Sequence, residues 1–154
     1  MKSTLLLFAS LLVFGAFTFS GTTEPIEPNS KALSADDKGI EFFHGTWKEA
    51  LEKAKAENKT IFVDIYATWC GPCKMMSNYV FTQQDVGDFY NENFICVKLD
   101  AEKGEGTAVA RKYRIMAYPT LLYVDGDGEL VHKTEGARSG NKMIVLGKKV
   151  FAKN

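Results

Sequence analysis

A nearly uninterrupted apolar segment, residues 59–67, is followed closely by two cysteines, Cys70 and Cys73. The segment is rich in β-branched and aromatic side chains, which predicts a strand that is covered on both faces of a sheet. Gly71 and Pro72 stand between the cysteines, and because proline is well placed in a first helical turn, a helix should begin there. The chain is therefore constrained to an α/β fold in which a buried strand leads into a helix at the cysteine pair.

Two cysteines at this spacing could form a structural disulfide, contribute to a metal site or act as a redox centre. A disulfide that closes so short a loop restricts the unfolded chain little, so it stabilises the fold poorly. A zinc site needs about four ligands, and the remaining candidates, Cys96, His44 and His132, show no second paired spacing. The chain has 3 cysteines, so at least one thiol has no cysteine partner within it. We therefore predict a redox centre and no metal site.

The predicted position of the pair favours thiol chemistry. Cys70 would lie at the N-terminus of the helix, where unpaired N–H groups and the positive end of the helix dipole stabilise a thiolate. Residues three apart in the first turn face the same side, so Cys73 is within reach for a disulfide. The outer thiol could attack a target disulfide, and the inner thiol could resolve the mixed disulfide. The reactive group is then the Cys70–Cys73 disulfide itself, and we expect no other cofactor.

Residues 1–20 predict a secretory signal peptide. Lys2 precedes an uncharged run of 15 residues, 5–19, which is shorter than the roughly 20 apolar residues of a membrane-spanning helix. Small residues on either side of Phe19 favour cleavage before Gly21. We therefore expect export to the periplasm or another extracytoplasmic compartment. The alternative is an uncleaved N-terminal segment that anchors the protein in the membrane.

Residues 21–38 contain two prolines, several acids and few large apolar side chains, which predicts a flexible linker. Residues 39–154 then form a single domain of 116 residues (154 − 38), which is enough for one hydrophobic core. The formal net charge of the whole chain is 0. Because no basic patch is evident, we expect no nucleic-acid partner. We expect the protein to be a monomer.

Helix and strand signals alternate along this domain. Thr46 and Glu49 form a capping-box pair that marks one helix start, and residues 125–128 carry a hairpin turn signal. The expected elements, in chain order, are a strand at 39–43, a helix at 46–58, a strand at 59–67, a helix from 71, a second helix start at Thr82, a strand at 94–100, a short helix at 106–115, a hairpin at 118–136 and a helix at 139–153. This order predicts an α/β fold with a central mixed β-sheet that is flanked by helices on both faces.

Residues 62–76, FVDIYATWCGPCKMM, resemble the active site of the thioredoxin family, including Trp69 before the first cysteine. Residues 97–100 resemble the following thioredoxin strand, and residues 112–124 resemble the segment that carries the family's cis-proline. The stretch at 80–94 is longer than in cytosolic thioredoxins and is similar to the thioredoxin-like C-terminal domain of bacterial thiol:disulfide interchange proteins. The resemblance implies a thioredoxin-like fold and dithiol chemistry.

The resemblance also implies roles for single residues at the redox centre. Cys70 would be the nucleophile and Cys73 the resolving thiol. Asp64 matches the family's buried acid behind the inner cysteine, which would relay a proton to or from Cys73. Lys98 matches the lysine that is paired with this acid.

A substrate-binding surface follows from the same resemblance. Pro119 would be cis and would place the backbone of Tyr118 against a bound substrate strand. Gly136 matches a glycine that lines this surface, although it could be a plain turn glycine. The surface is completed by Gly71, Pro72 and Trp69, the last of which could also serve in packing.

Three positions depart from the family pattern. Asn78 stands where the family has a proline that kinks the active-site helix. Tyr118 is bulkier than the usual small or β-branched residue, so the substrate preference could differ. Cys96 has no counterpart in the motif, and we expect a buried strand cysteine that acts as a small hydrophobic residue.

By resemblance, a Gly-Pro dipeptide between the cysteines favours the reducing end of the family, whereas strong oxidants and isomerases usually carry a histidine there. A histidine would stabilise the thiolate and make the protein more oxidising. We therefore expect an enzyme, a thiol:disulfide oxidoreductase, that reduces disulfide-containing proteins outside the cytosol. Such a reductase needs electrons, which a membrane-embedded thiol donor would supply. The alternatives are a dithiol oxidase or isomerase, or a binding module on the same fold without turnover.

Overall fold

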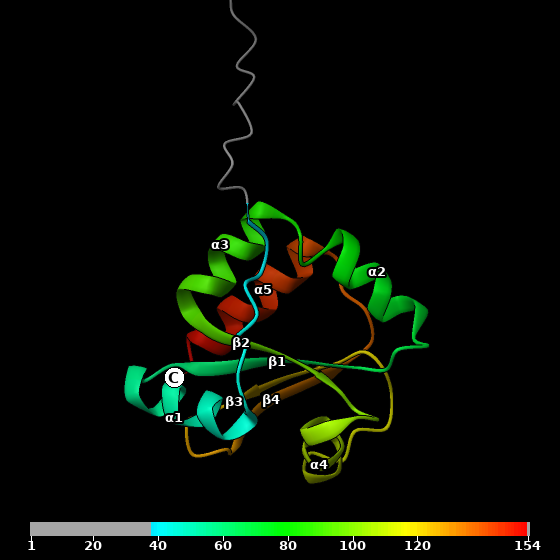
Figure 1. Cartoon of the computed structure of the whole chain (residues 1–154). Coiled ribbons are helices and arrows are strands. Elements are labelled where there is room, and N and C mark those ends of the chain that lie inside the picture. Colours follow the sequence, from blue (N-terminus) through cyan, green and yellow to red (C-terminus); the bar gives the residue numbers. More distant parts are fainter. Residues whose placement is uncertain (1–37, 154) are drawn as a thin grey trace, which may run out of the picture. The chain divides into compact units, whose positions relative to one another are not determined.

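The computed structural model describes residues 38–153. The predicted signal peptide, and all but the last residue of the predicted linker, lie outside the described residues. Five helices and four strands make up the described part of the chain (Figure 1). None of these described helices is long and apolar enough to span a membrane. The elements are α1 (Trp47–Glu57), β1 (Thr60–Tyr66), α2 (Gly71–Tyr79), α3 (Gln84–Asn93), β2 (Phe94–Asp100), α4 (Gly104–Lys112), β3 (Thr120–Val124), β4 (Leu130–Glu135) and α5 (Gly140–Phe151).

The strands form one mixed sheet in the order β2-β1-β3-β4. β1 pairs in parallel with β2 on one side and antiparallel with β3 on the other. β3 continues into the antiparallel hairpin with β4. Helices α2, α3 and α5 cover one face of the sheet, and α1 and α4 cover the other (Figure 1). The predicted α/β class, with a mixed sheet flanked by helices on both faces, is confirmed.

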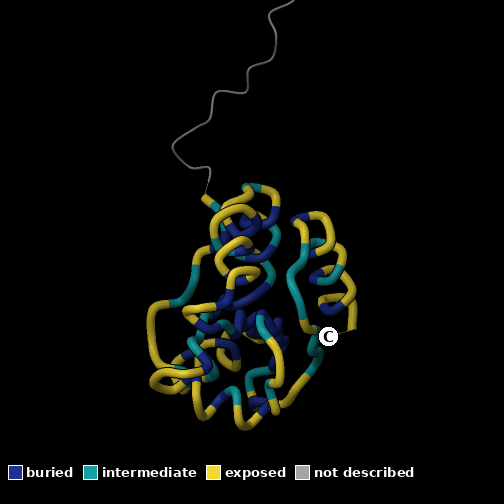
Figure 2. Tube along the Cα trace, turned by 90° about the vertical axis from the view of Figure 1, so that its right-hand side faces the viewer, coloured by how far each residue is buried: buried dark blue, intermediate teal, exposed yellow. Residues whose placement is uncertain are grey.

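The central strand β1 is buried over six of its seven residues. Its side chains alternate between the faces of the sheet. Phe62 packs with side chains of α2, α3 and α5, whereas Ile61 and Val63 pack with side chains of α1 and α4. Figure 2 shows the buried residues gathered in the interior, with the exposed residues on the outward turns of the helices and in the loops. The same alternation places Asp64, two residues after Phe62, on the α2 side of the sheet.

The predicted strand at 39–43 is wrong, because this segment joins no sheet. Its backbone N–H groups donate to three separate places in the fold, so it cannot form the repeated pairing of a ladder. Ile40 still packs in the core, which explains why the apolar pattern of this segment predicts a strand. The three bonds run from Ile40 N–H to the Phe81 carbonyl at 2.7 Å, from Glu41 N–H to Asn91 Oδ1 at 2.8 Å, and from Phe43 N–H to the Cys96 carbonyl at 2.7 Å.

Side-chain hydrogen bonds decide where two of the helices begin. The predicted capping box of α1 is confirmed, since Thr46 Oγ1 accepts the Glu49 N–H at 3.2 Å and Glu49 Oε2 accepts the Thr46 N–H at 2.7 Å. α3 begins at Gln84 rather than after an N-cap at Thr82, because the Thr82 hydroxyl donates to the Asn78 carbonyl of α2 at 3.0 Å. The predicted short helix is present as α4, with a start two residues earlier than expected.

Gly87 of α3 lets the N-terminal segment pass close to the helix. A Cβ at this position would lie 2.4 Å from the Lys38 carbonyl oxygen and 2.5 Å from the Gly39 carbonyl carbon. We expect Gly87→Ala to lower the free energy of unfolding, measured by urea denaturation, by about 1–3 kcal/mol, as overpacking does.

The matched control for this substitution is Gly71→Ala, because a Cβ at that helical position would have no atom within 4 Å apart from its chain neighbours and the backbone of its own helix. Its free energy of unfolding should change by less than about 1 kcal/mol, which is the size of the helix-propensity difference. Equal stability of the two variants would contradict the packing argument.

Candidate active site

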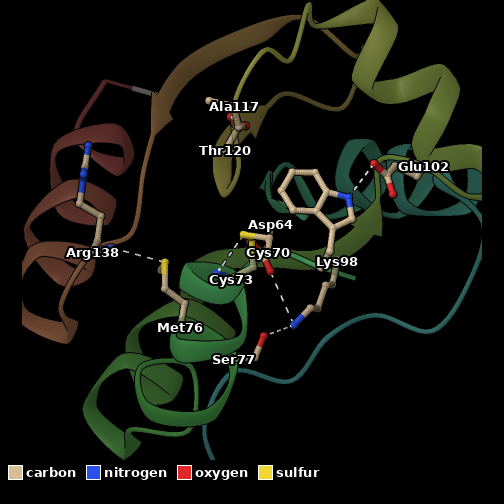
Figure 3. Close-up of a disulfide and its surroundings, with 11 residues drawn as sticks. Asp64, Cys70, Cys73, Met76, Ser77, Lys98, Glu102, Ala117, Thr120 and Arg138 are labelled. Atoms are coloured by element: carbon tan, nitrogen blue, oxygen red, sulfur yellow. Dashed lines mark hydrogen bonds and ion pairs between the residues drawn. A yellow bond between two sulfur atoms is a disulfide. The ribbon is translucent and has the colours of Figure 1, made fainter. Parts of the chain in front are cut away.

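The cysteine pair lies at the N-terminus of α2, shortly after β1 ends. Cys70 is the N-cap residue of α2 and is joined to Cys73 by a disulfide, with Cα atoms 5.3 Å apart. The predicted disulfide reach is therefore confirmed. The Cys73 N–H donates to Cys70 Sγ at 3.1 Å (Figure 3), so a helix-end N–H already points at the sulfur that would become a thiolate. The exposed fractions of Cys70 and Cys73 are 3% and 2%, so burial does not distinguish an outer from an inner sulfur in this oxidised state.

Asp64 lies in the middle of β1 and is only 1% exposed. Figure 3 shows its carboxylate between the disulfide and the Lys98 ammonium. Burial raises the pKa of Asp64 to about 6, and the positive charge of Lys98 acts in the opposite direction but is the smaller effect. A carboxyl group with such a pKa can take up or release a proton near neutral pH.

Lys98 forms the predicted ion pair with Asp64. The register of β1 and β2 places the two residues directly opposite each other, and Lys98 Nζ lies 3.7 Å from Asp64 Oδ2. Within the described chain, neither carboxylate oxygen of Asp64 has a hydrogen-bond partner. The ion pair is therefore the main polar interaction of this buried acid in the described structure.

Among the predicted substrate-binding residues, Tyr118 and Trp69 lie beside the disulfide. The peptide bond between Tyr118 and Pro119 is cis, as predicted, and the Gly136 N–H donates to the Pro119 carbonyl at 2.8 Å. Tyr118 packs on the cluster that contains the disulfide, and its ring centroid lies 5.7 Å from that of Trp69. Trp69 is 66% exposed, so it both packs and offers an apolar surface to solvent. The two remaining predicted residues, which are exposed in the first turn of α2, are Gly71 and Pro72.

Two polar residues of the site are not predicted by the sequence. Ser77 Oγ accepts a hydrogen bond from Lys98 Nζ, and Glu102 Oε1 accepts one from Trp69 Nε1 at 2.9 Å. Ser77 follows Cys73 by one helical turn, so its spacing could have indicated a place on the same helix face. Glu102 is 33 residues from Trp69 in the sequence, and no local pattern connects them.

Cys96 lies apart from this chemistry. It is on β2, is 3% exposed and remains a free thiol, as expected of a buried strand cysteine. Burial raises the pKa of Cys96 to about 12, so its thiol stays protonated and unreactive near neutral pH. Among the described residues, no group of three or more His, Cys, Asp or Glu side chains is placed to hold a metal ion.

Comparisons with known proteins agree with this geometry. A family model described as a thioredoxin-like domain matches residues 47–151. Chloroplastic thioredoxin Y of Oryza sativa subsp. japonica is 38% identical over 99 residues, which are 64% of this chain and 54% of that protein. The chain thus spans about half the length of this curated relative.

Two solved structures are similar over nearly their whole lengths. The first is a suggested disulphide-isomerase from Bacteroides thetaiotaomicron, which is 40% identical with a TM-score of 0.66; the match covers 76% of this chain and 97% of that chain. The second is the oxidised C-terminal domain of DsbD from Neisseria meningitidis, which is 27% identical with a TM-score of 0.58 and covers 71% and 98% of the respective chains.

The raised pKa of Asp64 links the stability of the oxidised protein to pH. The folded-state pKa of about 6 lies above the ordinary value of 3.8, so the folded protein holds a proton that the unfolded chain has already released between about pH 4 and pH 6. The stability from this group is present below about pH 4 and is lost as the pH rises through about 6. Relative to Asp64→Asn, the oxidised wild type should lose about 3 kcal/mol of unfolding free energy across this window, at 1.36 kcal/mol per pKa unit.

Urea denaturation of both oxidised proteins at several pH values measures this difference. Asp64→Asn is the matched reference for the wild type, because the amide has the size of the carboxyl group and does not titrate. Parallel pH dependence of the two proteins would show that the pKa of Asp64 is not raised by folding.

Proposed function

The chain belongs to the family of thioredoxin-like domains, and from this premise we propose that it is a thiol:disulfide oxidoreductase that reduces disulfides in other proteins. The observation that carries the proposal is the Cys70–Cys73 disulfide at the start of α2, with the buried Asp64–Lys98 pair behind it. A structural disulfide needs neither a helix N-terminus nor a titratable acid beside it. Thiol–disulfide exchange uses both.

The reaction begins with both cysteines reduced. The thiolate of Cys70 attacks one sulfur of a substrate disulfide, so that a new bond joins Cys70 to that sulfur and the other substrate sulfur leaves as a thiolate, which then takes up a proton. The Cys73 N–H, which lies 3.1 Å from Cys70 Sγ in the oxidised protein, and the N-terminal end of the α2 dipole stabilise the attacking thiolate.

The second step releases the substrate. Asp64 accepts the thiol proton of Cys73, and the resulting thiolate attacks the sulfur of Cys70. The mixed disulfide breaks, the second substrate sulfur leaves as a thiolate that is protonated, and the Cys70–Cys73 disulfide forms. Two electrons pass from the dithiol to the substrate. Lys98 limits the cost of the negative charge that Asp64 carries before it accepts the proton.

An extended substrate segment would bind beside the disulfide. The backbone of Tyr118, which precedes cis Pro119, offers hydrogen-bonding groups to such a segment, while Trp69 contributes an exposed apolar ring. Gly71 and Gly136 leave room for a backbone to approach. The bulk of the Tyr118 side chain restricts which substrate residues fit beside the reacting sulfur.

The direction of electron flow and the location are part of the same proposal. The Gly71-Pro72 dipeptide places no histidine between the cysteines, which favours a reducing protein. Residues 1–20 have the pattern of a secretory signal, which favours a place outside the cytosol, with an uncleaved membrane anchor as the alternative. A reductase there requires an electron supply, and a membrane-embedded thiol donor would provide it. The likeness to the C-terminal domain of DsbD supports disulfide-exchange partners.

A disulfide isomerase is the second candidate function. It is favoured by the 40% identity to the Bacteroides thetaiotaomicron protein for which isomerase activity is suggested. An isomerase also needs a reduced Cys70, but a second thiolate of the substrate then attacks the mixed disulfide, forms a new substrate disulfide and releases the Cys70 thiolate, so that no electrons are transferred overall and the Cys70–Cys73 disulfide does not accumulate.

Replacement of each cysteine tests the exchange chemistry. We expect the wild type to reduce insulin disulfides in the presence of dithiothreitol, and Cys70→Ser to lose this activity because no nucleophile remains. Cys73→Ser should instead accumulate a mixed disulfide between Cys70 and a substrate protein, which non-reducing electrophoresis and mass spectrometry detect. Cys96→Ser is the matched control and should behave as the wild type. A wild type that binds insulin without reducing it would favour a binding module.

The redox state of the protein in its own cells tests direction and location. We expect the mature protein to begin at Gly21, to be found outside the cytosol and to carry Cys70 and Cys73 mainly as thiols when it is trapped with an alkylating agent. Reduced thiols in an oxidising compartment require a donor. A mainly disulfide-bonded pair would favour the oxidase alternative, and an intact N-terminus in the membrane fraction would favour the anchor.

A further inference from the structure

We propose that Ser77 is a positioning residue of the exchange site, which holds the Lys98 ammonium partly away from the Asp64 carboxylate. The inference rests on the proposed proton transfer between Cys73 and Asp64. Ser77 lies in α2, one turn after Cys73, and is half-buried. By acting on Lys98 it sets the pH range in which Asp64 can serve as a base.

The contacts of Lys98 are the first observation. Its Nζ donates to Ser77 Oγ, whereas its separation from Asp64 Oδ2 is 3.7 Å. The second distance is within the range of an ion pair but beyond that of a hydrogen bond. Figure 3 shows the ammonium between the two oxygens, one from α2 and one from β1. The hydrogen bond of the ammonium therefore goes to the neutral hydroxyl and not to the carboxylate.

Three aromatic rings surround the same ammonium. The distances from Lys98 Nζ to the ring centroids are 5.0 Å for Tyr66, 5.7 Å for Phe42 and 5.7 Å for Phe81. Such rings attract a cation within about 6 Å, but their faces accept no strong hydrogen bond. The rings keep the ammonium in this region, and the Ser77 hydroxyl and the Asp64 carboxylate then compete to accept its hydrogen bond.

Asp64 would be the next acceptor if the hydroxyl were absent. Both of its carboxylate oxygens lack a hydrogen-bond partner within the described chain. Lys98 also borders a pocket of about 280 Å³ that is lined by Cys73 and Ser77 as well, so the ammonium has room to move. Without Ser77 Oγ, Lys98 would form a charge-assisted hydrogen bond with Asp64 and stabilise the ionised carboxylate. Asp64 would then be a weaker base toward Cys73.

Few other charged or titratable groups face Asp64. From β1, Tyr66 lies close enough for its pKa to be raised by the Asp64 charge, although burial is the larger cause. From β3, the residue opposite Asp64 is the apolar Leu121. From α2, the cysteines do not titrate while they form the disulfide, and Lys74 lines the same pocket of about 280 Å³ that Lys98 borders. In the oxidised protein a change at Ser77 therefore reaches Asp64 through Lys98.

The pH titration of Asp64 tests this role. The side-chain carboxyl carbon of Asp64 is followed by ¹³C NMR in the oxidised full chain, where the cysteines cannot contribute. We expect Ser77→Ala to lower the midpoint by about half a pH unit or more, as an added hydrogen bond to a carboxylate does. Ser77→Thr keeps a hydroxyl at this position and should keep the wild-type midpoint. The acid limb of the pH profile for insulin reduction should move in the same direction as the midpoint.

A second background tests whether Ser77 acts through Lys98. In Lys98→Met the midpoint of Asp64 should be the same with Ser77 and with Ser77→Ala, because the ammonium that Ser77 positions is gone. An unchanged or raised midpoint in Ser77→Ala, or a lowered midpoint that persists in Lys98→Met, would overturn the proposal. The titration needs no enzymatic activity. Failure of the proposed function would appear as absent insulin reduction, whereas failure of this inference would appear as an unmoved midpoint in a protein that still reduces insulin.

Discussion

The parallel pairing of β1 with β2 is the interaction on which the rest of the site depends. β1 is the central strand, so its register fixes what lies opposite each of its residues on both sides. The register with β2 places Lys98 opposite Asp64, and the alternation of β1 places Asp64 on the face that α2 covers. The same strand ends at Tyr66, shortly before Cys70 caps α2. One strand therefore positions the acid, the lysine beside it and the reactive sulfurs.

The buried carboxyl group of Asp64 lowers the stability of the protein near neutral pH, and the rest of the fold is stable without it. An ionised carboxyl group without hydrogen bonds is unfavourable in an apolar interior, and the 3.7 Å ion pair with Lys98 compensates this only in part. Apolar packing on both faces of the sheet stabilises the domain independently of Asp64. A residue that lowers stability near neutral pH, yet has a pKa suited to proton transfer, is typical of a functional site.

The sequence predicted most of the fold, and its errors have identifiable causes. The apolar residues at 39–43 indicated burial correctly, but whether a buried segment forms a ladder depends on neighbours far away in the chain. Thr82 is a good N-cap residue by type, yet its hydroxyl bonds back to Asn78 at the end of α2. In both cases the local pattern identified residues of the right type. Hydrogen bonds to other parts of the chain then decided whether they formed a strand or capped a helix.

The sequence by itself determined most of the elements and the reactive pair, because hydrophobic periodicity, capping residues and the spacing of Cys70 and Cys73 act over a few residues. The tertiary structure alone decided the hydrogen bond from Lys98 to Ser77, the hydrogen bond from Trp69 to Glu102 and the packing of Tyr118 on the disulfide. These contacts join residues about 20 or more positions apart, and their geometry follows from how helices pack on the sheet. The motif therefore specified the chemistry, and the packing of α2 against β1 and β2 specified the environment in which Asp64 can exchange a proton.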